Sequence, residues 1–228
     1  MRIIKSRSWL RVTAAAAVAG LAVSACGTMQ MGAAAITGNS RVTSGSLTAE
    51  VANLNAAYRA DKAKGIKPQR PVGQEVQQVL TWLILFRIYD QIAVRDHIDI
   101  TRAQAGRQLA QLSSQAATNK VTLAQYVSAG GAVPPNLTQQ LGRYFAILSE
   151  LESRITGGKP PATSAEQAKL QSAVARDQCL AAKDLAVTVN PQYGVFDYRS
   201  YSVVPAPPTL AAAPSSSPTA KALTTPPC

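Results

Sequence analysis

The sequence predicts a mainly α-helical domain, a bundle of about six helices with a small β element that pairs an N-terminal strand with a C-terminal strand. Three observations support this class. Aromatic residues make up only 5% of the chain, which is low for a β-sandwich. Apolar residues recur at helical spacing in several segments. Three Thr-x-x-Gln/Glu sequences, which begin at Thr101, Thr122 and Thr163, are typical of capping boxes at helix starts.

The first elements are short extended runs followed by a helix. Residues 32–38 and 41–42 are strand-like and are separated by a turn at Gly38-Asn39-Ser40. A helix is expected to begin at Thr43 or Ser44 and to end near Gly65. One face of this helix is apolar, with Leu47, Val51, Leu54 and Tyr58 at helical spacing.

Residues 72–94 form the most apolar segment of the domain. Arg87 and Asp90 interrupt it, so a membrane span is not expected. A helix that is apolar on nearly every side is typical of the centre of a bundle. Its main stripe, predicted to be core, contains Leu80, Leu83, Ile84 and Ile88. Three aromatic residues lie off that stripe and are the candidates for the lining of a groove: Trp82, Phe86 and Tyr89.

The remaining elements are predicted from helix-capping sequences and from Gly- or Pro-rich breaks between them. Helices are expected after Thr101 and Thr122, with Gly130-Gly131 closing the second, and a longer helix follows Pro134-Pro135. Residues 157–161 break the chain before the helix capped at Thr163. Residues 185–190 then alternate as in a strand, and residues 195–198 are extended after a turn at 191–194.

Residues 1–25 have the features of an export signal. They contribute four positive charges and no acid to the net charge of +11, and they end in an apolar, Ala-rich stretch too short to span a bilayer. The sequence Val23-Ser24-Ala25-Cys26 resembles the lipobox of bacterial lipoproteins. That resemblance implies lipid attachment at Cys26, residues 26–31 as a tether, and a location on the extracytoplasmic face of the cell membrane. The alternative is an ordinary secretory signal.

The far end of the chain is a Pro/Ser-rich segment of low complexity. Residues 203–228 are predicted to be a disordered tail, and residues 32–202 the folded domain. Cys179 lies on a predicted helix, where it is expected to be a small buried apolar residue. A bridge between Cys179 and Cys228, a free Cys228 and an intermolecular bond all remain open from the sequence.

Nothing in the sequence favours catalysis, a metal site or a cofactor. The single histidine, His97, excludes a two-histidine metal motif, and its neighbours Asp96 and Asp99 fit a solvated link between helices. Glu150 and Glu152 are two positions apart on a helix and point to different faces. No nucleic-acid partner is expected of an exported chain. The basic run at Lys62, Lys64, Lys67 and Arg70 is typical of a solvated face. In a lipid-anchored protein, the body that remains after residues 1–25, whose net charge is +7 once their four positive charges are subtracted from +11, would be drawn to anionic headgroups or wall polymers.

The order of elements resembles the N-terminal chaperone domain of the SurA family. The resemblance rests on residues 34–43, on the long helix that leads into residues 95–101, and on residues 187–194. The last segment is similar to the ending of actinobacterial lipoproteins grouped with that domain. Its signature turn contains Asn190, Pro191, Tyr193 and Gly194, and Gln192 stands where the family has arginine.

The resemblance implies a binding protein without the family's isomerase. Many members insert a parvulin domain where this chain has only the loop at residues 157–161, and parvulin sites use two histidines. The expected function is therefore that of a membrane-anchored chaperone-like lipoprotein that binds unfolded or newly exported polypeptides. Trp82, Phe86 and Tyr89 are then the candidates for the groove that binds these clients. The alternatives are a structural or scaffold lipoprotein that binds one envelope partner or wall polymer, and a lipoprotein that binds a small molecule.

Overall fold

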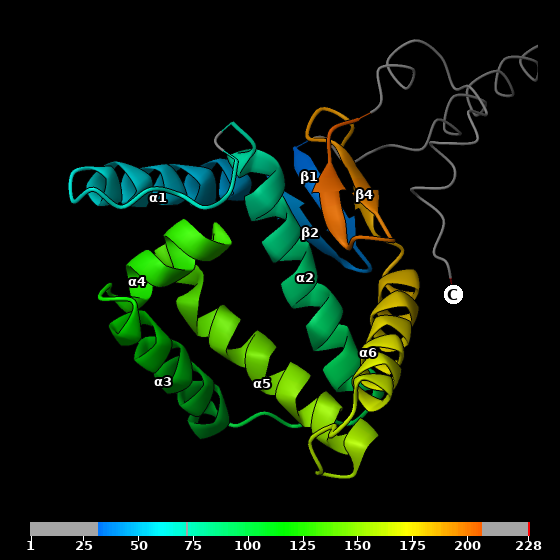
Figure 1. Ribbon diagram of the computed structural model, residues 1–228. Coiled ribbons are helices and arrows are strands. Elements are labelled where there is room, and N and C mark those ends of the chain that lie inside the picture. The colour runs from blue at the N-terminus through cyan, green and yellow to red at the C-terminus, as the bar shows by residue number, and fades with distance from the viewer. Residues whose placement is uncertain (1–31, 72, 207–227) are drawn as a thin grey trace, which may run out of the picture. The chain divides into compact units, whose positions relative to one another are not determined.

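A computed structural model of the chain describes residues 32–71, 73–206 and 228 (Figure 1). The predictions for residues 1–31, including the signal, Cys26 and the tether, lie outside the described residues, as does most of the predicted tail. The described elements confirm a mainly α-helical class. The helices are α1 (Ser44–Lys62), α2 (Glu75–Arg95), α3 (Arg102–Thr118), α4 (Leu123–Gln125), α5 (Thr138–Thr156) and α6 (Ser164–Asp184).

The small β element joins the two ends of the described domain, as the sequence predicts. Strand β1 (Ala33–Thr37) is the centre of an antiparallel sheet, with β2 (Ser40–Thr43) on one edge and β3 (Thr188–Val189) on the other. The strand predicted at 185–190 is shorter than expected, because Leu185 caps α6 and Ala186 turns the chain with a φ of 44° before β3 begins.

A second antiparallel pair, β4 (Val195–Asp197) and β5 (Ser202–Val204), includes a strand that the sequence analysis missed. Residues 203 and 204 are therefore part of the fold, which corrects the boundary placed at residue 202. The backbone N–H of Val203 donates to the Thr81 hydroxyl on α2 over 2.8 Å, so β5 is held directly against the central helix.

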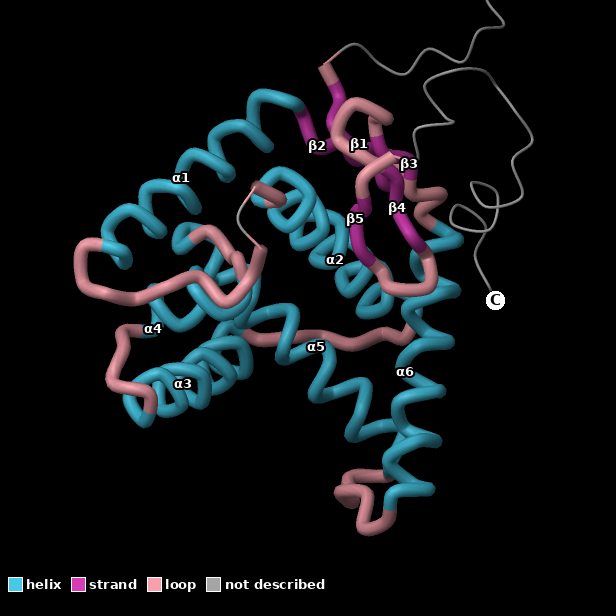
Figure 2. Tube along the Cα trace, turned by 45° about the horizontal axis from the view of Figure 1, so that its top comes forward, coloured by secondary structure: helices cyan, strands magenta, loops and turns pink. Residues whose placement is uncertain are grey.

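Helix α2 is the centre of the domain, and Figures 1 and 2 show α1, α5, α6 and the strands around it. This confirms the prediction of a central apolar helix. Its buried side chains include Val79, Leu80, Ile84, Ile88 and Ile92, each fully inaccessible to solvent. No helix in the described part of the chain combines the length and apolar character needed to cross a bilayer.

Helices α3 and α5 lie side by side at a glycine (Figure 2). A Cβ atom added at Gly142 would stand 2.6 Å from Cγ of Leu109 and 3.0 Å from the carbonyl oxygen of Ala105. Only glycine therefore allows the two helices to approach this closely without a shift of one of them. This contact matters for the site, because α3 and α5 form two of its walls.

The short helical segment after α3 is not the single helix that the sequence predicts. Thr122 does form a capping box with Gln125, but α4 has only three residues and continues as a π-helix (Tyr126–Gly130). A 3₁₀ turn (Pro135–Leu137) then leads into α5. π-Helical turns are rare and often mark functional sites.

The disulfide question is settled by the structure. Cys179 on α6 is buried, as predicted, and it is bonded to Cys228 rather than free. The backbone N–H of Cys228 also donates to the Cys179 sulfur over 3.1 Å. The last residue of the predicted tail is thus fixed to the domain, which corrects the expectation of a tail that is disordered to its end.

The signature turn at residues 190–194 holds the β element together. The backbone N–H of Asn190 donates to Ala34 over 2.9 Å, and its side-chain amide donates to Ala33 over 3.2 Å. The backbone N–H groups of Gln192 and Tyr193 donate to Asn190 and so close a turn after Pro191. Gly194 has a φ of 133°, and a Cβ atom there would collide with the carbonyl of Val204. These residues are structural.

Candidate functional site

The three aromatic residues predicted to line a client groove do not share one surface. Tyr89 is 2% exposed and packs on Tyr144 of α5 with ring centroids 4.3 Å apart, while its hydroxyl accepts from Gln178. Phe86 is 6% exposed and touches a smaller cavity described below. Of the three, only Trp82 lines the larger cavity described next. Tyr89 is therefore part of the core, which corrects its assignment to the groove.

Burial also determines the chemistry of this tyrosine pair. Desolvation is the largest cause that raises the pKa of the Tyr89 hydroxyl, and it likewise raises the pKa of Tyr144. Phenols are neutral at physiological pH even without this shift, and burial holds these two further in the neutral form while their rings pack on each other.

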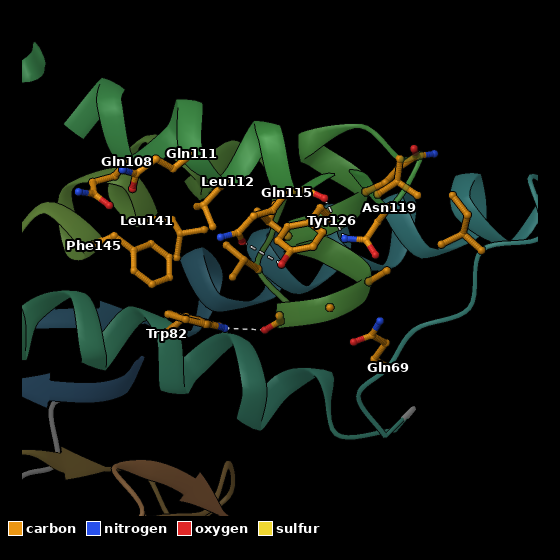
Figure 3. Close-up of a pocket in the computed structure, with 18 of the residues that line it drawn as sticks. Gln69, Trp82, Gln108, Gln111, Leu112, Gln115, Asn119, Tyr126, Leu141 and Phe145 are labelled. Carbon is orange, nitrogen blue, oxygen red and sulfur yellow. Dashed lines mark hydrogen bonds between the residues drawn. The ribbon is translucent and has the colours of Figure 1, made fainter. Parts of the chain in front are cut away.

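The larger of the two cavities described here has a volume of about 660 Å³ and lies between α3, α5, the π-helix and the loop that follows α1 (Figure 3). Trp82 of α2 and Leu112 of α3 lie on opposite sides of it, and Leu141 and Phe145 come from α5. We call this cavity the glutamine groove, because its polar lining is dominated by amide side chains. These amides are Gln69, Gln108, Gln111, Gln115, Asn119 and Gln125.

The π-helix forms the inner wall of the glutamine groove. The indole Nε1 of Trp82 donates to the carbonyl of Gly131 over 2.7 Å, and the Tyr126 hydroxyl donates to Gln115 over 3.2 Å. Behind this wall, the hydroxyl of Ser128 donates to the carboxylate of Asp61 over 3.1 Å, with both side chains buried. These bonds attach the wall to α2, α3 and α1. The aromatic rings are thus held in place before any ligand arrives.

The glutamine groove has amide and aromatic groups but almost no charge. Among the described residues, Lys67 is the only charged one that lines it. Each glutamine offers two N–H donors and a carbonyl acceptor, so the lining can bond to either half of a peptide group. A volume of this size is within the range of ligand sites in proteins. The arrangement suits binding of an uncharged polar chain with apolar side groups.

A second cavity of about 280 Å³ lies where β2, α1, α2 and α5 meet, and it is charged. Arg143 pairs with Asp90 over 2.9 Å, and the Asn136 amide donates to Glu50 over 2.9 Å. Arg41 and Arg87 also line this cavity. Three of its charged side chains, Arg143, Asp90 and Glu50, have bonded partners, in contrast to the nearly neutral glutamine groove.

The residues considered for catalysis take structural positions. His97 is exposed in the link between α2 and α3 with a φ of 51°, and its carbonyl accepts from Arg154. Asp96 pairs with Arg95, and Glu150 pairs with Arg154. Among the described residues, no three His, Cys, Asp or Glu side chains gather closely enough to hold a metal ion.

Sequence analysis missed most of the groove, although one signal was present. Residues Gln104, Gln108, Gln111 and Gln115 follow one another at helical spacing, which places them along one face of α3. The roles of Tyr126 and Phe145 had no comparable signal, because they depend on how the π-helix and α5 pack against α2. Local patterns do not encode that packing.

Comparison of the chain with family models, with curated proteins and with solved structures gives no match. The resemblance to the SurA family therefore stays a prediction that rests on the residues given above.

Proposed function

We propose that this protein is a membrane-anchored, extracytoplasmic chaperone-like lipoprotein that binds unfolded or newly exported polypeptides, without isomerase activity. The observation that carries the proposal is the glutamine groove, in which preset aromatic and aliphatic surfaces alternate with amide side chains. Lipid attachment at Cys26 and the location at the cell membrane belong to the same proposal and rest on the sequence.

The chemistry of the groove fits an extended polypeptide whose sequence varies. An unfolded segment exposes backbone N–H and C=O groups that need partners, and glutamine amides satisfy both kinds. Apolar client side chains would pack on Trp82, Leu112 and Phe145, where burial of apolar surface contributes about 25 cal/mol per Å². Neither contact depends on a particular client sequence. Hydrogen bonds from the amides and apolar contacts with the rings are sufficient for a protein that binds clients without catalysis.

The proposal is tested by aggregation assays on residues 27–228, which include every described residue. We expect near-stoichiometric amounts to suppress aggregation of several unrelated denatured proteins, measured by light scattering. Leu112→Gln, which places an amide on the apolar wall, should weaken this protection. Ile155→Gln makes the same change at an exposed position of α5 that lines neither cavity, and it should leave protection intact.

The rival function is that of a scaffold lipoprotein with one defined envelope partner or wall polymer. The second cavity favours it, because the fixed pair Arg143–Asp90 and the bonded Glu50 would suit a single complementary partner. If the chain protects no denatured client, and Arg143→Ala abolishes capture of one envelope component, the scaffold function replaces the chaperone function.

A further inference from the structure

The chain around the glutamine groove contains no acidic residue over long stretches. Residues 62–74 and 100–149 hold no Asp or Glu. Every residue that lines the groove falls within these two stretches except Trp82. The carboxylates at the two ends of the first stretch are bonded: Asp61 is 4% exposed and accepts from Ser128, and Glu75 accepts from the backbone of Gly73. At the ends of the second stretch, Glu150 pairs with Arg154, whereas Asp99 is exposed and does not line the groove.

The same stretches carry positive charge at the edges of the groove. Lys67 lines the groove from the loop after α1. Lys120 stands between the lining residues Asn119 and Val121 at the end of α3, and its side chain is exposed. None of the four ion pairs in the described part of the chain involves either lysine. The groove therefore presents amides, apolar groups and one lining lysine, and a second lysine stands in the chain between two of its lining residues.

We propose that the glutamine groove selects polypeptide segments in which an apolar residue is flanked by carboxylates. This inference rests on the proposed function and specifies the class of client. The apolar residue would occupy the space between Trp82 and Leu112, and the flanking carboxylates would lie near Lys67 and Lys120. Lysine-flanked segments would meet two cations with no carboxylate to offset them, so they are disfavoured.

The expected preference is modest, because the lysines are exposed. Solvent-exposed ion pairs change affinity by about 1.5- to 5-fold each. Two pairs therefore predict an affinity for acidic segments about 2- to 25-fold above that for neutral segments of equal length. Salt screens exposed charges, so this ratio should fall as ionic strength rises.

The experiment uses residues 27–228, a chain in which Trp82 is the only tryptophan. Three tryptophan-free peptides share one apolar centre and carry Glu, Gln or Lys on both sides. Binding is followed by the fluorescence of Trp82, which lies in the groove. The expected order of affinity is Glu, then Gln, then Lys, with the spread shrinking between about 20 mM and about 500 mM salt.

Charge reversal provides the decisive variants. The double variant Lys67→Glu, Lys120→Glu should reverse the order of the three peptides. The matched control Lys169→Glu, Lys183→Glu changes the net charge equally on α6, away from either cavity, and should keep the original order. The double variant Lys67→Gln, Lys120→Gln removes both charges without reversing them, and it should bind the three peptides with equal affinity. It keeps the inference testable if the charge-reversed variant fails to fold.

The outcomes separate this inference from the function on which it rests. If no peptide binds, the proposed function fails. If all three bind equally at low salt, the function stands and the selectivity for carboxylates is overturned. Inorganic polyphosphate is the last ligand to be tested. If it binds as tightly as the Glu peptide and causes the same change in Trp82 fluorescence, the groove is a site for phosphate polymers and the inference is overturned.

Discussion

The indole nitrogen of Trp82 donates a hydrogen bond to the carbonyl oxygen of Gly131, 2.7 Å away and 49 positions further along the chain. This bond joins the central helix to the segment that follows the π-helix. It fixes the plane of the indole where the ring lines the glutamine groove. A single side chain thus links the stability of the domain to the shape of the glutamine groove.

Replacing Trp82 with phenylalanine tests that link. Trp82→Phe keeps an aromatic ring but removes the N–H, so the Gly131 carbonyl loses this partner. We expect the free energy of unfolding to fall by about 1–3 kcal/mol, measured by urea denaturation followed by circular dichroism. Peptide affinity, measured by fluorescence anisotropy of labelled peptides, should fall as well. Tyr126→Phe, which removes an exposed bond to Gln115, should cost less than about 1 kcal/mol; an equal loss would contradict this role for Trp82.

The disulfide between Cys179 and Cys228 should stabilise the domain substantially. The bond spans 49 positions, for which chain entropy predicts a loss of up to about 4 kcal/mol in Cys228→Ser. Urea denaturation of residues 27–228 with and without reductant measures this contribution. Reduction should lower the midpoint of the wild-type chain and leave that of the variant unchanged. A wild-type midpoint that is insensitive to reduction would argue against the bond, as would thiol labelling of the unreduced, denatured chain.

Gly142 should be intolerant of even one added methyl group. Its Cβ would overlap Leu109 across the contact between α3 and α5, so we expect Gly142→Ala to destabilise the domain by about 1–3 kcal/mol. Gly106→Ala on α3 is the matched control, because nothing lies within 4 Å of a Cβ there. Since alanine favours a helix over glycine, that control should gain up to about 1 kcal/mol. Equal effects at both positions would show that α3 and α5 are not in close contact.

The stability that the N-terminal cap of α6 contributes should depend on pH more than the contributions of the caps of α3 and α4. Backbone N–H groups of Ala162 and Thr163 donate to the Glu166 carboxylate and lower its pKa below the usual 4.5. Stability from a lowered pKa is present above the unfolded value and is lost as pH falls through the folded value. The advantage of the wild type over Glu166→Gln, measured by urea denaturation from neutral pH downward, should therefore shrink only below about pH 4.5.

The other two capping boxes serve as internal controls for that titration. Gln104 and Gln125 accept from the backbone of Thr101 and Thr122 in the same geometry but carry no charge. Gln104→Ala should therefore cost the same stability at every pH in this range. A wild-type advantage over Glu166→Gln that stays constant across the range would show that the carboxylate does not carry the effect.

Most of the fold follows from local patterns, and the exceptions have tertiary causes. Helical spacing and three capping boxes locate α1, α2, α3, α5 and α6, because these signals involve residues within one or two turns of each other. Strand β5 has no such signal: its three residues are extended because β4 pairs with them and Thr81 accepts from Val203. The same holds for the disulfide, which depends on where Cys228 meets α6.

The candidate site was predicted less well, and α2 shows why. Trp82 and Tyr89 both lie off the apolar stripe of that helix, so the sequence treats them alike. Tyr144 of α5 covers Tyr89, whereas the groove beside Trp82 stays open because α3, α5 and the π-helix pack around it without filling it. The neighbouring elements decide which face of a central helix stays exposed. The hydrophobic pattern of that helix carries no information about those elements.

The position of β1 in the middle of its sheet determines the order in which its two edges are paired during synthesis. A chain emerges N-terminus first, so β2 can join β1 at once, whereas β3 appears about 150 residues later. Throughout that interval one edge of β1 offers unpaired backbone groups, and such edges recruit other strands. The nascent chain therefore passes through a stage in which it exposes a strand edge until residues 188–190 arrive to cover it.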